Sequence, residues 1–400
     1  MAIRSRTLLG GTLVLTGAAA LAATAVVRRW DAAGDPCGGE PLATPKGEEF
    51  LIRTDDGTEL SGTVAGDEGG RLVVLAHCWT GDRRVWGPVA QRLVDTGHRV
   101  VLYDHRGHGR STVGRDGLTV EALASDLRDV LDHVDARGAV LAGHSMGGMT
   151  AQAFATGHPE VLRERVASLV LVSTSAADVA PDARLLAFMR RALVSPRIDR
   201  AMGQRTLGPL MVRNIVGRDA VGSHLRAVVE TYLATPPGHR LDFGNSMAEM
   251  DLTPGLPDIP LPTVVVTGLR DTLAPPANSR RIVSLIPGSR LVTFPDAGHM
   301  LPFEIPDDLA RIIAEAAAAV TLAAATTSPG APAAKARKAP ARKAPGTRKA
   351  PGTRKAAGAK VLPTPAAPSP PTPKELRPRT AAGESPAAEA PESTNGSGEA

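Results

Sequence analysis

The chain has 400 residues, of which 42% are hydrophobic and only 3% aromatic, and its formal net charge is +5. This length is too great for one ordinary domain, and the composition excludes collagen, a disulfide scaffold and a wholly disordered chain. The charge is uneven, because residues 331–400 carry +8 and residues 1–30 carry +4, so residues 31–330 carry −7. We therefore expect an acidic folded body between two basic ends.

The N-terminal region contains an uncharged stretch of twenty-one residues, Thr7 to Val27, with two arginines on each side. About twenty apolar residues can span a bilayer as a helix. A cleaved signal has a shorter apolar region and a small-residue cleavage site, for which Ala22 to Ala25 would serve. We predict a transmembrane anchor in residues 1–30, with a signal segment, or neither, as alternatives. The protein would be membrane-anchored or exported to the cell envelope, in an orientation that arginines on both sides leave open.

Residues 31–47 are rich in Gly, Pro and Asp, which predicts a short flexible linker. The folded domain is then expected over residues 48–325. It begins with a hairpin, because Phe50–Thr54 and Thr58–Ala65 flank the turn signal Asp56-Gly57.

Short runs rich in Val and Leu then alternate with amphipathic stretches. Such runs are typical of strands buried on both faces of a parallel sheet. The expected strands are Leu72–Ala76, Val100–Tyr103, Val140–Ala142, Ser168–Val172, Thr263–Thr267 and Leu291–Phe294. The expected helices are 85–95, 119–135, 146–156, 277–285 and 307–324. This order predicts an α/β fold with a mostly parallel sheet covered by helices on both faces.

One segment interrupts the alternation. Residues 176–255 contain helical patterns, such as Arg184–Ala192 and Ser223–Thr235, but no strand-like run. We interpret the insertion as a helical cap over the carboxyl ends of the strands, where open α/β sheets bind ligands.

The strongest chemical signal is Gly143-His144-Ser145-Met146-Gly147, which follows a predicted strand and precedes a predicted helix. This is the context of a G-x-S-x-G turn, in which the serine occupies a strained conformation above the sheet. The glycines are needed because side chains at those positions would clash with neighbouring backbone. The Met146 amide would lie at a helix N-terminus, which stabilises negative charge.

A serine hydroxyl needs a base, and the base needs a group that orients it. Asp271 follows one predicted strand and His299 follows the last, so the chain order is Ser, Asp, His. With these residues in place, the sequence resembles the serine-type α/β-hydrolases over about residues 50–320. The other matching segments are His77-Cys78-Trp79, Asp104–Ser111 and Gly298-His299 followed by Glu304-Ile305-Pro306.

The resemblance implies a role for each residue. Ser145 would be the nucleophile, His299 the general base and then acid, and Asp271 the carboxylate that orients the imidazole. The backbone amides of Trp79 and Met146 would form the oxyanion hole. Cys78 stands where the family usually has glycine, which puts the conformation of that loop in doubt.

Other interpretations of these residues remain open. Asp271 could cap a helix before Pro275, and Asp296 and Asp178 are rival carboxylates. His77 and His144 are expected to be structural, as is Arg106, and Met247, Met250 and Met300 to be core or pocket wall. Cys37 and Cys78 are expected to be free thiols. Because no metal-ligand spacing or phosphate-binding loop occurs in the sequence, no cofactor is implied.

The C-terminal residues 326–400 are predicted to be a disordered, basic tail rich in Pro, Ala and Lys. From residue 329 onward the tail has fourteen prolines and no aromatic residue, so it cannot form a core. Its cations could attach the protein to an anionic surface. We do not expect nucleic acid as a partner, because aromatic residues that stack on bases are absent from the sequence of the tail.

The sequence therefore predicts a serine hydrolase acting on carboxylic esters or acyl lipids, with a small-molecule substrate and no cofactor. A cofactor-free perhydrolase or a C–C bond hydrolase would use the same three residues. A non-catalytic protein that binds surfaces or nucleic acid through its tail is the alternative of another class. The intact set of three residues argues against that last alternative.

Overall fold

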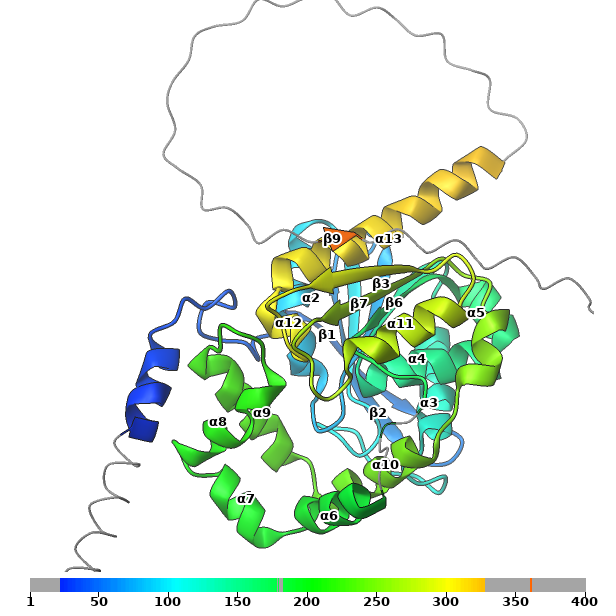
Figure 1. Cartoon of the computed structure of the whole chain (residues 1–400). Coiled ribbons are helices and arrows are strands. Elements are labelled where there is room, and N and C mark those ends of the chain that lie inside the picture. Colours follow the sequence, from blue (N-terminus) through cyan, green and yellow to red (C-terminus); the bar gives the residue numbers. More distant parts are fainter. Residues whose placement is uncertain (1–21, 178, 180–182, 328–359, 362–400) are drawn as a thin grey trace, which may run out of the picture. The chain divides into compact units, whose positions relative to one another are not determined.

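The computed structural model describes residues 22–177, 179, 183–327 and 360–361. Its centre is one nine-stranded sheet (Figure 1). The strands are β1 (Gly47–Arg53), β2 (Glu59–Gly66), β3 (Leu72–Ala76), β4 (Arg99–Tyr103), β5 (Ala139–His144), β6 (Val166–Val172), β7 (Thr263–Gly268), β8 (Arg290–Phe294) and β9 (Lys360–Val361).

The order across the sheet is β1-β2-β4-β3-β5-β6-β7-β8-β9. The strands from β4 to β8 in this order pair in parallel, whereas β1, β2 and β9 pair antiparallel with their neighbours. The predicted α/β fold with a mostly parallel sheet is thus confirmed. Each strand expected from an apolar run is present and begins or ends within three residues of the prediction.

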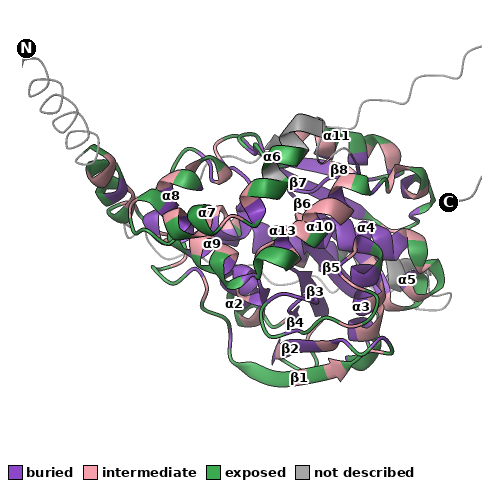
Figure 2. Cartoon of the chain, turned by 90° about the horizontal axis from the view of Figure 1, so that it is seen from below, coloured by how far each residue is buried: buried purple, intermediate pink, exposed green. Residues whose placement is uncertain are grey.

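Two groups of helices cover the two faces of the sheet. α3 (Val120–His133), α4 (Met146–Gly157) and α11 (Pro276–Leu285) pack on the face that carries Val74 and Leu141. α2 (Gly87–Asp95) and α13 (Pro306–Thr327) pack on the other face. Successive strand residues point to opposite faces, so a strand covered on both sides is apolar at every position. Figure 2 shows this buried centre between more exposed helices.

Shorter helices connect these elements. They are η1 (Arg83–Trp86), α5 (Pro159–Arg165), η3 (Thr253–Asp258) and α12 (Leu301–Glu304). The sequence patterns did not indicate α5 or α12, because each spans at most two turns.

The cap segment forms helices without a strand among its described residues. These helices are α6 (Ala183–Leu193), α7 (Pro196–Met202), α8 (Leu207–Met211), η2 (Arg213–Ile215), α9 (Gly222–Ala234) and α10 (Pro237–Glu249). The expected patterns at Arg184–Ala192 and Ser223–Thr235 correspond to α6 and α9. The structure therefore agrees with a helical insertion between β6 and β7.

The segment predicted to be a flexible linker makes extensive contacts. Residues 22–31 are helical, and Trp30, Cys37 and Leu42 pack against a buried cluster that includes Leu225 of α9 and Phe303 of α12. The composition of residues 31–47 hid these contacts, because they join residues far apart in the sequence.

The ends of the chain lie mostly outside the described residues. This applies to most of the anchor predicted in residues 1–30 and to nearly all of the basic tail. The described part of the tail is residues 326–327, at the end of α13, and Lys360 and Val361, which pair with β8. Within the described residues, no helix combines the length and the apolar character that crossing a membrane requires.

Candidate active site

Ser145 occupies a strained turn between β5 and α4. Its φ of 54° and ψ of −115° lie in a region that non-glycine residues rarely adopt. The flanking glycines permit the turn: a Cβ on Gly143 would lie 2.2 Å from the Gly147 carbonyl oxygen, and one on Gly147 would lie 2.1 Å from that of Ala76. The Ser145 backbone is held by its N–H to Val172 O at 2.9 Å and by the Thr174 hydroxyl to its carbonyl at 2.7 Å.

Asp271 and His299 meet at the same edge of the sheet. Asp271 Oδ2 lies 2.8 Å from His299 Nδ1, and both side chains are buried. Asp271 Oδ1 accepts from the amides of Leu273 and Ala274 at 2.9 and 2.8 Å. Burial alone would raise the pKa of Asp271, but the charge of His299 and these hydrogen bonds together lower it below its usual value. The carboxylate therefore stays ionised and fixes the imidazole.

His144 connects the serine turn to the histidine loop. Its Nε2 lies 2.8 Å from the carbonyl oxygen of His299, and the two rings are 5.0 Å apart. Burial lowers the pKa of His144 to about 3, so its ring is neutral and acts as a donor to that carbonyl. The structural role expected for His144 is therefore to hold the loop of His299 beside Ser145.

Glu304 of α12 holds the same loop from the other side. Its Oε2 accepts from the amides of Gly298 and Gly217, each at 2.8 Å, and its Oε1 accepts from Met300 N–H at 3.0 Å. His299 N–H donates to Ile215 O at 2.8 Å, so the cap segment also contacts the loop directly. The sequence placed Glu304 in a family motif without assigning it this role.

The loop after β3 carries the predicted oxyanion residue Trp79. His77 fixes this loop, because its Nδ1 donates to Cys78 O at 2.8 Å and its Nε2 accepts from His105 N–H at 2.9 Å. The Thr80 amide donates to His108 Nε2 at 3.3 Å. Burial lowers the pKa values of His77, His105 and His108, so all three rings are neutral and can accept or donate as the loop requires.

The cysteine at the position where the family usually has glycine is buried. The Cys78 side chain packs in a buried cluster with Val85 and Met300, and its thiol is free. Burial raises the pKa of this thiol to about 12, so it is protonated at neutral pH and is not a second nucleophile. In the described chain, neither Trp79 N–H nor Met146 N–H donates to a backbone carbonyl.

The cap covers this part of the site through α10. A Cβ on Gly244 would lie 3.5 Å from the Trp79 indole, and Phe243 packs against His108 with ring centroids 5.2 Å apart. The Trp79 indole N–H is buried and has no hydrogen-bond partner in the described structure.

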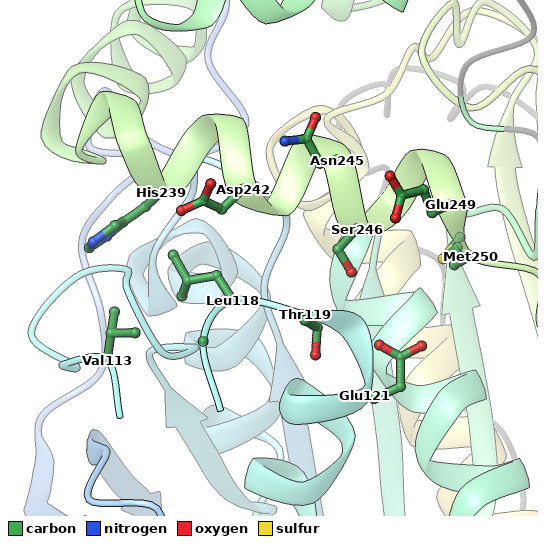
Figure 3. Close-up of a pocket in the computed structure, with 11 residues that line it drawn as sticks. Val113, Leu118, Thr119, Glu121, His239, Asp242, Asn245, Ser246, Glu249 and Met250 are labelled. Carbon is green, nitrogen blue, oxygen red and sulfur yellow. The ribbon is translucent and has the colours of Figure 1, made fainter. Parts of the chain in front are cut away.

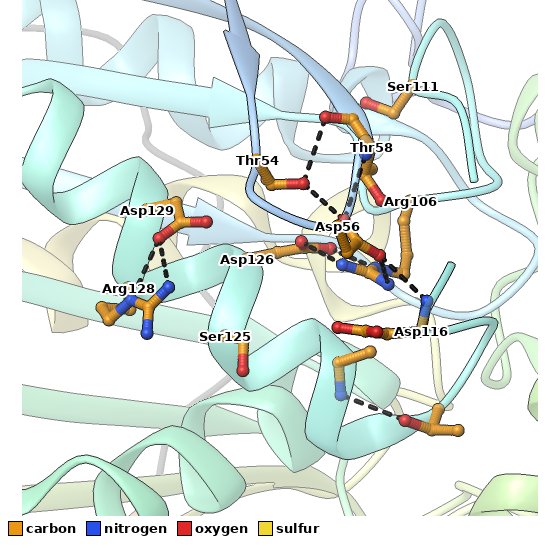
Figure 4. Close-up of polar contacts among 12 residues, drawn as sticks. Thr54, Asp56, Thr58, Arg106, Ser111, Asp116, Ser125, Asp126, Arg128 and Asp129 are labelled. Atoms are coloured by element: carbon orange, nitrogen blue, oxygen red, sulfur yellow. Dashed lines mark hydrogen bonds and ion pairs between the residues drawn. The ribbon is translucent and has the colours of Figure 1, made fainter. Parts of the chain in front are cut away.

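A second buried network is centred on Arg106, in the loop that follows β4 (Figure 4). Arg106 donates to Asp126 through two nitrogens, at 2.7 and 2.6 Å, and to Asp56 Oδ2 at 3.0 Å. Its Nη1 also reaches Gly117 O at 3.1 Å. Every nitrogen of the guanidinium is thereby occupied. The network fixes the loop from β4 to α3 to the β1–β2 turn and to α3, which agrees with the structural role expected for Arg106.

A cavity near the cap does not contain the three candidate residues. It has a volume of about 630 Å³ and lies between α10 and the loop that leads into α3 (Figure 3). Three carboxylates line it, those of Glu121, Asp242 and Glu249, together with His239 and Met250. Met247 and Met300 are buried, as expected of core residues.

One group of potential metal-ligating residues lies where the N-terminal segment meets α9 and α12. Potential ligand atoms of Asp35, Cys37 and His224 all lie within 4.8 Å of one another. Both oxygens of Asp35 already accept hydrogen bonds, from His224, Ser223 and the amides of Cys37 and Gly39. Burial raises the pKa of the Cys37 thiol to about 12. The group therefore functions as a link between the N-terminal segment and α9.

The rival residues differ from the candidate set. Asp296 is half-exposed and pairs with Arg218 and Arg270 at 3.3 and 3.6 Å. Asp178 lies outside the described residues. Asp271 does accept from two amides ahead of α11, as a turn residue would, while its other oxygen remains on His299.

Comparisons with known proteins extend over most of the domain. The model of the alpha/beta hydrolase family matches residues 73–312. A non-heme chloroperoxidase of Kitasatospora aureofaciens is 26% identical over 64% of this chain and 94% of its own length. An sn-1-specific diacylglycerol lipase of Mus musculus is 28% identical over 59% and 77%. The solved structure of a thermophilic esterase from Thermogutta terrifontis is 31% identical, with a TM-score of 0.57 over 68% of this chain and 99% of that one.

Proposed function

The chain belongs to the alpha/beta hydrolase family, and on this premise we propose that it is a serine hydrolase that cleaves carboxylic esters through an acyl-enzyme. The observation that carries the proposal is the 2.8 Å hydrogen bond between Asp271 and His299, at the sheet edge where the strained turn presents Ser145. A base oriented by a buried carboxylate is what a serine hydroxyl needs to become a nucleophile.

The reaction follows from these three residues. Ser145 Oγ attacks the ester carbonyl while His299 Nε2 takes the hydroxyl proton, and the imidazolium is stabilised by Asp271. The tetrahedral intermediate collapses as His299 returns the proton to the departing alcohol, which leaves an acyl-serine. Water then attacks the acyl carbonyl, with His299 again as base, and the carboxylic acid and free Ser145 are released.

The negative charge of the tetrahedral intermediate needs donors that are already in position. The amides of Trp79 and Met146 are proposed for this role, since Met146 begins α4 and Trp79 lies in the loop held by His77. Removal of one such donor typically lowers turnover by about 10²–10³-fold.

The nature of the substrate is supported by the relatives. The T. terrifontis protein is an esterase and the mouse relative is a diacylglycerol lipase. We infer that uncharged carboxylic esters, among them acyl lipids, are the substrate class. The anchor predicted in residues 1–30 would bring the enzyme to such lipids. Cell fractionation tests this: the full chain should pellet with membranes and resist extraction by high salt.

A cofactor-free perhydrolase is the second candidate, and the similarity to a non-heme chloroperoxidase favours it. Hydrogen peroxide in place of water would attack the acyl-serine and release a peracid. Purified protein incubated with acetate and hydrogen peroxide should then form peracetic acid faster than it hydrolyses p-nitrophenyl acetate. Faster hydrolysis of the ester favours the esterase.

Ser145→Ala tests the proposal directly. Loss of the nucleophile should lower turnover of p-nitrophenyl esters by about 10⁶-fold, as in other serine hydrolases. A matched control is Ser173→Ala, which removes another serine at a strand end that also has a positive φ, of 46°. Substantial turnover by a folded Ser145→Ala protein would refute the mechanism.

A further inference from the structure

The outer helices of the cap carry a surface that the proposed chemistry does not use. We propose that α6, α7 and α8, with the residues that join them, form a docking surface for a bilayer that contains anionic phospholipids. This cap surface consists of four exposed apolar residues and five exposed arginines. They are Phe188, Val194, Leu207 and Met211, and Arg190, Arg191, Arg197, Arg200 and Arg205.

The apolar side chains are concentrated on the cap. Ten large hydrophobic residues are exposed in the described chain, and five of them lie on the cap. Phe188 is 67% exposed. Leu207 and Met211 stand four positions apart on α8 and therefore share one face of that helix. A soluble surface tolerates single apolar residues, but a group of them on consecutive helices indicates a partner that removes them from water.

The charge of the cap is opposite to that of the rest of the domain. Residues 183–250 contain ten arginines and five acidic residues and carry +5, so the remainder of residues 31–330 carries −12. Other cap arginines are neutralised by carboxylates: Arg240 pairs with Asp199, and Arg218 with Asp296.

The five arginines of the cap surface, in contrast, are not neutralised by described carboxylates. None of them forms an ion pair with a described carboxylate; Arg190 donates to the amide oxygen of Asn245. They are therefore available to anionic headgroups. Each arginine near the surface of an anionic membrane strengthens the binding.

The N-terminal helix of residues 22–31 lies next to the cap surface. Figure 1 shows α6, α7 and α8 in succession along the outer rim of the cap, with the helix of residues 22–31 beside α8 and α9. This helix is attached there, because Asp31 pairs with Arg226 of α9 and Arg213 lies over the Trp30 ring. The described chain therefore begins beside α9, at the side of the cap where α8 lies.

A phospholipid bilayer accounts for both components of the surface. Apolar side chains enter the boundary between headgroups and acyl chains while cationic side chains remain among the headgroups. Duplex nucleic acid would account for the arginines alone. A lipid bilayer is therefore the partner that explains both the exposed apolar residues and the exposed arginines.

The test measures contact at the cap itself, through dyes attached there, because the N-terminal stretch and the basic tail could also hold the full chain on vesicles. Phe188→Cys and Leu207→Cys in the full chain are labelled with a dye whose emission shifts to the blue in an apolar environment. Leu51→Cys on the edge strand β1 is the control, because Leu51 is also an exposed apolar residue. The native thiols should label slowly at neutral pH, since burial raises the pKa values of Cys37 and Cys78 to about 12.

Each labelled protein is mixed with vesicles of phosphatidylcholine alone or with one third phosphatidylglycerol. The dyes at 188 and 207 should shift to the blue on the anionic vesicles, and the dye at 51 should not. In the Phe188→Cys background, Arg197→Gln with Arg200→Gln should weaken the shift by more than tenfold in vesicle concentration, since each arginine contributes about fivefold. Arg137→Gln with Arg163→Gln, on the body of the domain, should leave the shift unchanged.

The contrary results are equally definite. Unshifted dyes at 188 and 207 on a protein that cosediments with the vesicles would overturn the proposal, and so would an equal shift at 51. A response to duplex DNA in place of vesicles would assign the surface to another partner and also overturn it. Because these readouts measure contact and not turnover, they do not depend on the proposed hydrolase activity.

Discussion

Two buried acid–base groups lie near the same edge of the sheet, and they are completed differently. Arg106 is surrounded by Asp126, Asp56 and the Gly117 carbonyl, so each of its nitrogens has a partner. Asp271 is also saturated, by two amides and His299 Nδ1, but among the described hydrogen bonds none occupies His299 Nε2. A closed network can only hold the chain in place, whereas an oriented base with one free nitrogen can move a proton.

Asp271→Asn should cause the largest loss of turnover among the variants that distinguish the two groups. The asparagine amide no longer fixes the imidazole tautomer or stabilises its cation, so turnover of p-nitrophenyl acetate should fall by about 10⁴-fold. The rival carboxylate provides the control, because Asp296→Asn changes a half-exposed residue that pairs with surface arginines. Steady-state kinetics on both variants decide the matter; equal losses would remove Asp271 from its assigned role.

Arg106→Met should lower the stability of the folded protein and should not act on the reaction itself. Removal of the guanidinium leaves Asp126 and Asp56 buried without their cation, which should lower the free energy of unfolding by about 3–5 kcal/mol. Arg110→Met removes an exposed ion pair with Glu49 and should cost about 1 kcal/mol or less. Urea denaturation followed by circular dichroism measures both. Similar costs for the two variants would contradict the closed network.

Glu304→Gln should have a smaller effect on turnover. An amide places an oxygen at only one of the two positions where the carboxylate accepts three N–H groups, so the loop that carries His299 should shift. A displacement of this kind lowers turnover by about ten- to a hundredfold. Glu315→Gln on α13 is the control, since Glu315 pairs with exposed Arg311. Turnover of Glu304→Gln equal to that of the control would show that the loop does not need Glu304.

The raised pKa of Glu304 should also make the stability of the protein depend modestly on pH. Burial raises the pKa of Glu304 above its usual value of 4.5, although the three amide donors oppose this shift. The folded state therefore binds this proton more tightly than the unfolded state does. The stability of the wild type relative to Glu304→Gln should be greatest below pH 4.5 and should decrease as the pH rises through the folded pKa. Unfolding curves at pH 4 and pH 7 test the sign; an increase would contradict it.

The sheet could be predicted from the sequence because burial on both faces leaves a local signal. A run such as Val140–Ala142 is apolar at each position, and the ends of such runs placed Ser145, Asp271 and His299 at one edge. Parallel strands bring their carboxyl ends to the same edge whatever the sequence between them.

The remaining features depend on contacts that leave no local signal. Glu304 accepts from Gly217, eighty-seven residues away, and Asp35 accepts from His224, which is more distant still. Trp30 and Leu42 belong to the folded domain because they meet α9 and α12, although residues 31–47 have the composition of a linker. In the cap, α7 and α8 are too short to show a helical period.

The measurement that tests the central claim most directly is labelling with a serine-reactive phosphonate, followed by peptide mapping in a mass spectrometer. The account predicts one adduct per chain, on Ser145, formed in proportion to the loss of ester hydrolysis and much more slowly in Asp271→Asn. An adduct on another serine such as Ser173, or full inactivation with Ser145 unmodified, would contradict the assignment of the nucleophile.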